Sequence, residues 1–381
     1  MFNTPDNPVS PHQSLLAKRH SRWSWQAWHL DPYLLLGLAV LSLLGLFILY
    51  SASNQNISMV LQQISRLAIA FAVMFVLAQI PPHRYQQWAP WIYLISVIFL
   101  VLVLLVGQWD HGARRWLGVG SVRFQPSEVM KISLPMMLAY YLNDHPLPPN
   151  IFTSIKTAIL FVIPVLLTAR EPDLGTAIVI LGAGLFILLL AGMSWKLISG
   201  LLGLAILSAP ILWHFMHPYQ RARVLTLLDP ERDPLGAGYH IIQSKIAIGS
   251  GGFWGKGYLQ GTQSRLQFLP THTTDFIFSV SGEEWGFIGS IILLTLFVLV
   301  LARVLYISAH AQNTFGRLLA GSLGFTFFLS MYINMGMVTG ILPVVGIPLP
   351  LISYGGTSML SMMAGFGIIM SMQTHRKLWS S

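Results

Sequence analysis

Long runs of apolar residues, separated by short polar segments, recur from residue 33 to residue 372 of this chain. Runs of about 17–25 apolar residues are long enough to cross a bilayer as helices, and these runs lack the alternation typical of a membrane β-barrel. The pattern predicts an all-α polytopic membrane protein with about ten transmembrane helices. The predicted spans are Tyr33–Tyr50, Met59–Gln79, Trp91–Gly107, Val129–Leu142, Phe152–Thr168, Leu174–Met193, Leu197–Trp213, Gly286–Tyr306, Leu318–Leu342 and Leu349–Met372.

The polar segments divide the chain into a predicted N-terminal tail (residues 1–32), a transmembrane domain (33–375) and a short C-terminal tail (376–381). The first tail carries Lys18, Arg19 and Arg22 before three tryptophans, which is typical of a cytoplasmic segment ending in an aromatic anchor. No cleavable signal peptide is evident. With ten spans, both termini are predicted to be cytoplasmic. The loop at 214–285, between spans seven and eight, is too long for a passive connection and is predicted to lie outside.

Composition supports this class of protein and excludes others. Hydrophobic residues make up 54% of the chain and charged residues only 9%, which is too apolar for a soluble protein of this length. The chain contains no cysteine, so disulfides, thiol catalysis and cysteine-based metal sites are excluded. The net charge of +9 does not indicate nucleic-acid binding, because the cations are divided between two membrane faces and form no basic helix. Anionic lipid headgroups are the partner that fits.

The distribution of acids points to the outer face. A count of Lys and Arg in the short loops does not settle the orientation, but nearly all acids fall on the outer side when the N-terminus is placed inside. One of them, Asp275, stands alone between a Pro/Thr/His-rich turn and an apolar run. Because an ionisable group at membrane depth is costly, it indicates a functional site. Glu283 and Glu284 follow it, and for them a solvated helix start is the alternative.

Two further outer segments carry charges at helix starts. Glu128 and Lys131 are three residues apart and share one helix face if Ser127 caps that helix. They form either the polar wall of a cavity or a local ion pair that lets a lysine enter the membrane. Asp173 lies beside Pro172, where it belongs either to the site or to an ordinary helix start.

The remaining outer segments are rich in glycine and proline. The stretch Gly249–Gly257 lacks the ending of a nucleotide-binding phosphate loop. The segment before it, Gly238–Ile248, has apolar positions consistent with a helix lying in the interface. The segment Gly340–Gly356 predicts an ordered turn whose polar residues, Ser353 and Tyr354, line a cavity, since non-helical backbone at membrane depth is tolerated there.

Together these motifs resemble the SEDS family (shape, elongation, division and sporulation proteins), and the resemblance extends from the first span to the last. Gly261–Ser264 and Asn334–Val338 resemble its elongation branch. The other segments that carry the resemblance are Gly112–Trp116, Phe124–Glu128 with Lys131, Arg170–Thr176, Gln243–Gly249, Thr274–Phe278, Glu283–Glu284 and Leu349–Gly356.

The resemblance implies a peptidoglycan glycosyltransferase of the bacterial cytoplasmic (inner) membrane, with its active site facing the periplasm. The implied substrate is lipid II, a disaccharide-pentapeptide on undecaprenyl diphosphate. The implied partners are a class B penicillin-binding protein, which is a transpeptidase, and the elongation machinery. Asp275 matches the essential acid of the family, and Glu128, Lys131 and Asp173 match other functional polar positions. The chain departs from the family pattern at Thr271, where an acid is usual, and at Thr273, where a histidine is usual; a histidine stands at His272 instead.

These residues fit the chemistry of sugar transfer. Asp275 is the candidate general base that takes the proton of the attacking hydroxyl. The diphosphate leaving group needs cations, for which we select Arg114, Arg115, Lys131, Arg221 and Lys245. A divalent cation, Mg²⁺ or Mn²⁺, is an alternative source of positive charge, although no protein ligand set demands one.

Two rival functions share this pattern. A flippase for lipid-linked precursor needs polar groups through both leaflets, whereas the acids here gather on one face. A non-catalytic scaffold does not explain Asp275.

The implied transpeptidase needs a groove for its membrane helix. Small residues of the last two spans predict such a docking groove: Gly316, Gly321, Gly324, Gly365 and Gly367.

Overall fold

The computed structural model describes residues 28–110, 113–119, 122–194, 196, 199–200, 203, 207, 213–214, 216, 218–232, 237–265 and 271–375. Almost all of the predicted N-terminal tail, most of the seventh predicted span and the C-terminal tail lie outside these residues. The membrane helices are α2 (Pro32–Ala52), α3 (Ile57–Gln79), α4 (Pro82–Val106), α5 (Pro126–Asn143), α6 (Ile151–Arg170), α7 (Leu174–Leu190), α12 (Ile277–Ala309), α13 (Thr314–Thr339) and α14 (Thr357–Thr374).

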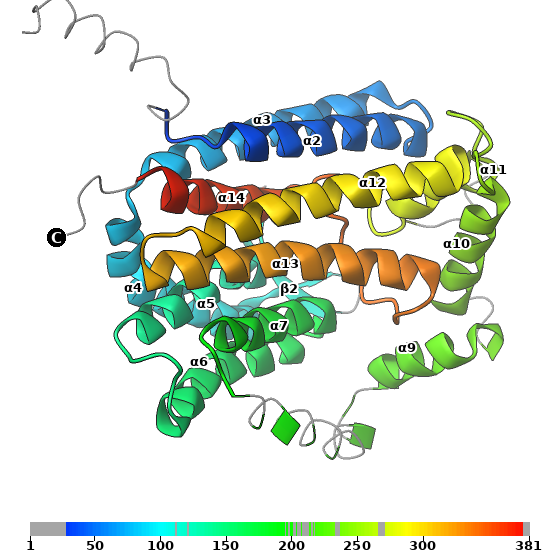
Figure 1. The fold of residues 1–381 in the computed structure, drawn as a ribbon. Helices are drawn as coiled ribbons and strands as arrows, with labels where there is room; N and C mark the ends of the chain where they lie inside the picture. Colours follow the sequence, from blue (N-terminus) through cyan, green and yellow to red (C-terminus); the bar gives the residue numbers. More distant parts are fainter. Residues whose placement is uncertain are drawn as a thin grey trace, which may run out of the picture.

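The predicted fold class is confirmed: this is a multi-pass helical membrane protein. Within the described residues, six helices (α2, α3, α4, α6, α12 and α13) are long and apolar enough to cross a membrane, and α7 is a shorter apolar helix. The number of ten spans is not confirmed. Figure 1 shows the helices lying side by side, with the shorter helices α9 (Pro218–Leu228), α10 (Ala237–Gly251) and α11 (Thr262–Arg265) at the end where α12 begins.

Several predicted boundaries are wrong for local reasons. The last span was predicted from Leu349, but α14 begins at Thr357 because the preceding residues form a proline-rich loop. Similarly, α12 begins at Ile277 rather than Gly286. Gly286 instead interrupts the helix with a φ of 65°, and a Cβ there would lie 2.4 Å from the backbone nitrogen of Gly255, so only glycine fits.

The prediction that Ser127 caps the helix of the fourth predicted span is also wrong. That helix, α5, begins one residue earlier at Pro126, with Gln125 at the cap position and no side-chain capping bond. Proline is favoured at the first helical position because its φ is already helical and it has no N–H to satisfy. Glu128 still falls in the first turn, as predicted.

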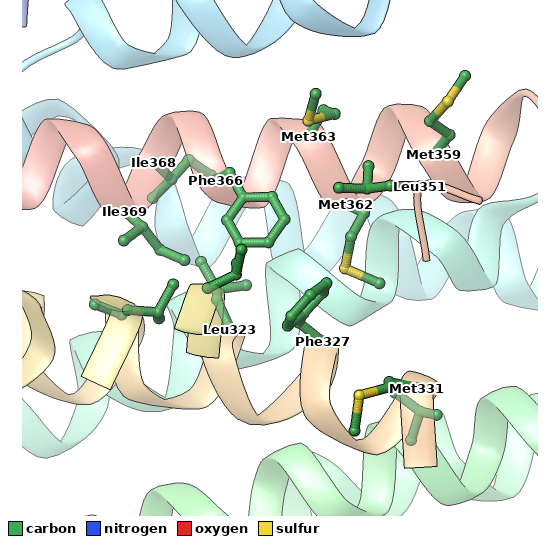
Figure 2. Close-up of a cluster of buried hydrophobic side chains, with 14 of the residues drawn as sticks. Leu323, Phe327, Met331, Leu351, Met359, Met362, Met363, Phe366, Ile368 and Ile369 are labelled. Carbon is green, nitrogen blue, oxygen red and sulfur yellow. The ribbon is translucent and has the colours of Figure 1, made fainter. Parts of the chain in front are cut away.

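The interior of the bundle is built from apolar stripes at helical spacing. Figure 2 shows Leu323, Phe327 and Met331 of α13 facing Met362 and Phe366 of α14. The rings of Phe327 and Phe366 meet edge to face with centroids 5.2 Å apart, and the flexible methionines fill the gaps around them. This packing fixes α14, and with it the loop that precedes α14.

The small residues proposed as a docking groove face the interior. A Cβ on Gly321 would lie 2.4 Å from Leu190, one on Gly324 2.5 Å from Val304, and one on Gly367 2.4 Å from the carbonyl oxygen of Met74. These glycines let neighbouring helices approach closely. The interpretation of this set as a partner surface is therefore wrong for these three positions.

A small antiparallel sheet follows α4 and was not predicted. Its strands are β1 (Gln108–Asp110), β2 (Ala113–Val119) and β3 (Val122–Phe124), in the order β1-β2-β3. Strand β2 contacts α4 and α5. It therefore carries Arg115 and Trp116 to the N-terminal end of α5, beside Glu128.

Candidate functional site

A cavity of about 420 Å³ opens among β2, α5, α7, the residues just before α12 and the loop before α14. Its polar and apolar lining comes from segments far apart in the sequence. Six of the residues selected from the sequence line it: Arg115, Glu128, Lys131, Asp173, Asp275 and Tyr354. The bundle therefore brings these six side chains together around one cavity beside the start of α12.

Asp275 lies immediately before α12 and is partly buried. Burial raises the pKa of its carboxyl to about 6, against the opposing influence of the Arg223 and Arg115 guanidinium groups. Because a general base works best with a pKa near the working pH, this environment suits proton abstraction at neutral pH.

The backbone around Asp275 is held by hydrogen bonds to two other segments. Asn334 of α13 donates its side-chain amide to the carbonyl oxygens of Asp275 (2.8 Å) and Ile347 (2.7 Å). The Ser353 hydroxyl donates to the carbonyl oxygen of Thr274 (2.6 Å) and accepts the N–H of Leu349 (2.8 Å). Ser353 therefore fixes the backbone beside Asp275 and does not line the cavity.

Glu128 and Lys131 form a buried ion pair within the first turns of α5. The Lys131 Nζ lies 2.7 Å from Glu128 Oε1, and both side chains are less than a tenth exposed. The second carboxylate oxygen of Glu128 accepts a hydrogen bond of 2.6 Å from the Ser361 hydroxyl of α14. The pair thus joins α5 to α14 at the wall of the cavity.

The turn between α6 and α7 supplies two acids in different environments. Asp173 caps α7 by accepting the Thr176 N–H (3.2 Å), and it also accepts the amide of Gln125 (2.8 Å). Glu171 is fully buried. Burial and the neighbouring Asp173 raise the pKa of Glu171 to about 9, despite Arg115. The Arg115 guanidinium donates to the carbonyl oxygen of Pro172, which places this cation between the turn and the cavity.

The other selected cations lie elsewhere. Lys245 is exposed and lies against Gly340, at the C-terminal end of α13. Arg221 donates to the carbonyl oxygen of His214 (2.5 Å). On the same helix it is Arg223 that acts on the pKa of Asp275. Residues two apart lie on different faces of a helix, and the sequence alone does not show which face meets the site. The side chain of Arg114 lies outside the described residues.

Glu283 and Glu284 are neither solvated nor part of the cavity lining. Glu283 is fully buried and accepts hydrogen bonds from Lys256 Nζ (2.7 Å) and from the backbone N–H groups of Thr262 (2.8 Å) and Gln263 (3.1 Å). Glu284 accepts from the Ser51 hydroxyl of α2. Glu283 therefore holds the segment after α10 against α12, and Glu284 joins α12 to α2, so the solvated helix start is excluded for both.

Comparison with known proteins gives consistent matches along the chain. The FTSW_RODA_SPOVE family, described as "Cell cycle protein", matches residues 29–378. The chain is 53% identical over 357 residues to the peptidoglycan glycosyltransferase MrdB of Escherichia coli (strain K12), across 93% of this chain and 96% of that protein. It is 31% identical to the peptidoglycan glycosyltransferase RodA of Treponema pallidum (strain Nichols), across 91% and 98%.

Solved structures are similar over the same extent. A chain from work on "structural coordination of polymerization and crosslinking by a peptidoglycan synthase complex" aligns with a TM-score of 0.80 and 35% identity, covering 91% of this chain and 98% of that one. The crystal structure of the rod shape determining protein RodA of Thermus thermophilus aligns with a TM-score of 0.69 and 28% identity, covering 91% and 98%.

Proposed function

Because this chain belongs to the FtsW/RodA/SpoVE family and is a peptidoglycan glycosyltransferase, we propose that it polymerises lipid II into glycan strands during cell elongation, with Asp275 as the general base. The protein lies in the bacterial inner membrane with both termini cytoplasmic and the cavity facing the periplasm. The observation that carries this proposal is the meeting of Asp275 with Arg115, Lys131 and Glu128 around one cavity.

The proposed reaction is a single displacement at the anomeric carbon of the donor sugar. The acceptor hydroxyl attacks that carbon and loses its proton to a carboxylate oxygen of Asp275. The bond from the anomeric carbon to the lipid diphosphate breaks, and the diphosphate leaves with the electron pair. Arg115 and Lys131, which line the cavity, stabilise the charge that develops on the leaving group.

The proposed steps need no divalent cation held by the protein. Within the described part of the chain, no three His, Cys, Asp or Glu side chains come together in a way that could hold a metal ion. Glu128 is already paired with Lys131. The proposed steps therefore use only the chain's own cations.

The proposed partner follows from the similarity of this chain to solved structures. One similar solved chain belongs to a complex in which polymerization and crosslinking are coordinated. By analogy we assign a class B penicillin-binding protein as the transpeptidase that crosslinks the strand made here.

The test is synthesis of glycan chains by purified protein from lipid II, with and without Asp275→Asn. This change removes the base but keeps the size of the side chain, so we expect loss of polymerisation with normal insertion and stability. The control is Thr271→Ala, which changes an exposed side chain in the same turn. Normal glycan synthesis by Asp275→Asn contradicts the general-base role. Lipid transport without polymerisation by the unmodified protein would favour a flippase.

A further inference from the structure

Arg66 is a cation inside a membrane helix, and no acid of the described residues forms an ion pair with it. It lies about 14 Å along the axis of α3 from Ile57, at 1.5 Å per residue. Among the described residues, the ion pairs join Lys131 to Glu128, Lys256 to Glu283 and Arg303 to Asp31, and none includes Arg66. A charge at such depth is costly unless an anion or a polar cavity receives it.

The surroundings of Arg66 place it at the edge of the catalytic cavity. Its guanidinium carbon lies over the ring of Tyr354, 4.4 Å from the centroid. A Cβ on Gly356 would lie 3.7 Å from Arg66 Cδ. Tyr354 and Gly356 both line the cavity that contains Asp275. Arg66 therefore contacts two of the residues that line one side of that cavity.

The same face of α3 is built to hold this wall in place. The Tyr354 hydroxyl donates to the side-chain carbonyl of Gln62 (2.8 Å), and Gln63 donates to the carbonyl oxygen of Ser353 (3.2 Å). The backbone N–H of Tyr354 in turn donates to the carbonyl oxygen of Thr273, close to the general base (2.9 Å). The position of Arg66 is thus fixed relative to Asp275 by a short series of contacts.

The chemistry of the guanidinium selects its ligand. A cation–π contact with Tyr354 leaves the N–H donors of the group available for hydrogen bonds. Within the described residues, Arg66 makes no hydrogen bond through those donors. A planar fork of N–H groups matches the oxygens of a phosphate bidentately. A polyprenyl diphosphate carries such oxygens on a chain that lies in the membrane.

We propose that Arg66 is a diphosphate-binding residue, which holds the polyprenyl diphosphate of the lipid-linked substrate at the α3 side of the cavity. The proposal rests on the proposed function, because it assumes that this cavity receives a lipid diphosphate. It adds a residue on α3 to the cations on β2 and α5, so that the diphosphate is bound from two sides of the cavity.

The experiment measures binding of farnesyl diphosphate to the purified full-length protein in nanodiscs. We expect Arg66→Ala to weaken binding about 10- to 100-fold, the loss typical of one charge-assisted contact. Arg66→Lys should retain part of the affinity, because lysine keeps the charge but not the bidentate fork. The matched control is Ser65→Ala, which changes an exposed neighbour on the same helix.

Three results overturn the proposal. The first is that Arg66→Ala binds farnesyl diphosphate as tightly as the unmodified protein does. The second is that the unmodified protein binds farnesol as tightly as farnesyl diphosphate. The third is that phosphatidylglycerol displaces the probe as well as farnesyl diphosphate does, which would indicate a site for bulk phospholipid. If Arg66→Ala does not fold, Arg66→Gln replaces it in the same assay. Polymerisation by Asp275→Asn would contradict the proposed base while leaving the Arg66 binding result intact, so the two failures are distinguishable.

Discussion

Replacing Lys131 by methionine leaves the carboxylate of Glu128 buried without its cation. The two groups are 2.7 Å apart and both side chains are less than a tenth exposed, so little water reaches the carboxylate in place of the missing cation. Breaking a buried pair from one side costs about 3–5 kcal/mol, whereas replacing both charges by groups of similar size is often neutral. We therefore expect Lys131→Met and Glu128→Gln each to lower the free energy of unfolding by about that amount.

The double variant separates stability from activity. Glu128→Gln with Lys131→Met should recover most of the lost free energy of unfolding, because no unpaired charge is left and the amide still bonds to Ser361. Polymerisation of lipid II should stay lost, since Lys131 lines the cavity. Denaturant unfolding of the four proteins in one detergent gives the coupling energy.

Two outcomes would refute this reasoning. Additive losses of stability in the double variant would mean that the pair is not coupled. Recovery of full activity on exchanging the charges, Glu128→Lys with Lys131→Glu, would show that the pair is purely structural and that Lys131 does not contact diphosphate.

Three further predictions concern other parts of the molecule. With Asp275 as the proposed base and a pKa of about 6 for its carboxyl, the polymerisation rate should rise with pH up to about 6 and then level off; a rate that is constant from about pH 5 to 8 would contradict this. Glu171 has a pKa of about 9 in the folded protein against 4.5 ordinarily, so stability falls as pH rises between these values, and Glu171→Gln should remove that fall and unfold at a higher temperature at pH 8. An identical pH dependence of stability in both proteins would refute it. Gly324→Leu should lower protein abundance, because the added side chain meets Val304 inside the bundle, and should leave transpeptidase co-purification per molecule unchanged; selective loss of the partner would show the opposite.

The sequence predicts the depth of a residue in the membrane better than the direction in which it points. Asp275, Glu128, Lys131 and Asp173 were selected because each is polar at the outer end of an apolar run, and the structure places all four around one cavity. The membrane explains why these four predictions agree with the structure. The thickness of the bilayer fixes the depth of each apolar helix, and therefore the depth of the polar groups at its ends.

Direction around the helix axis depends on packing, which a single sequence does not show. Arg221 was selected where Arg223 acts on Asp275, and Arg66 was passed over because α3 is otherwise an ordinary apolar span. The sheet of β1–β3 was missed for a related reason: its strands are short, and they become regular only by pairing with each other.

The turn before Asp275 contacts the rest of the site largely through its main chain. The carbonyl oxygen of Thr273 accepts the N–H of Tyr354, that of Thr274 accepts the Ser353 hydroxyl, and that of Asp275 accepts the amide of Asn334. Contacts of this kind do not depend on the identity of the side chain. The side chains at Thr271 and Thr273 can therefore vary while the main-chain geometry that presents the carboxylate is kept.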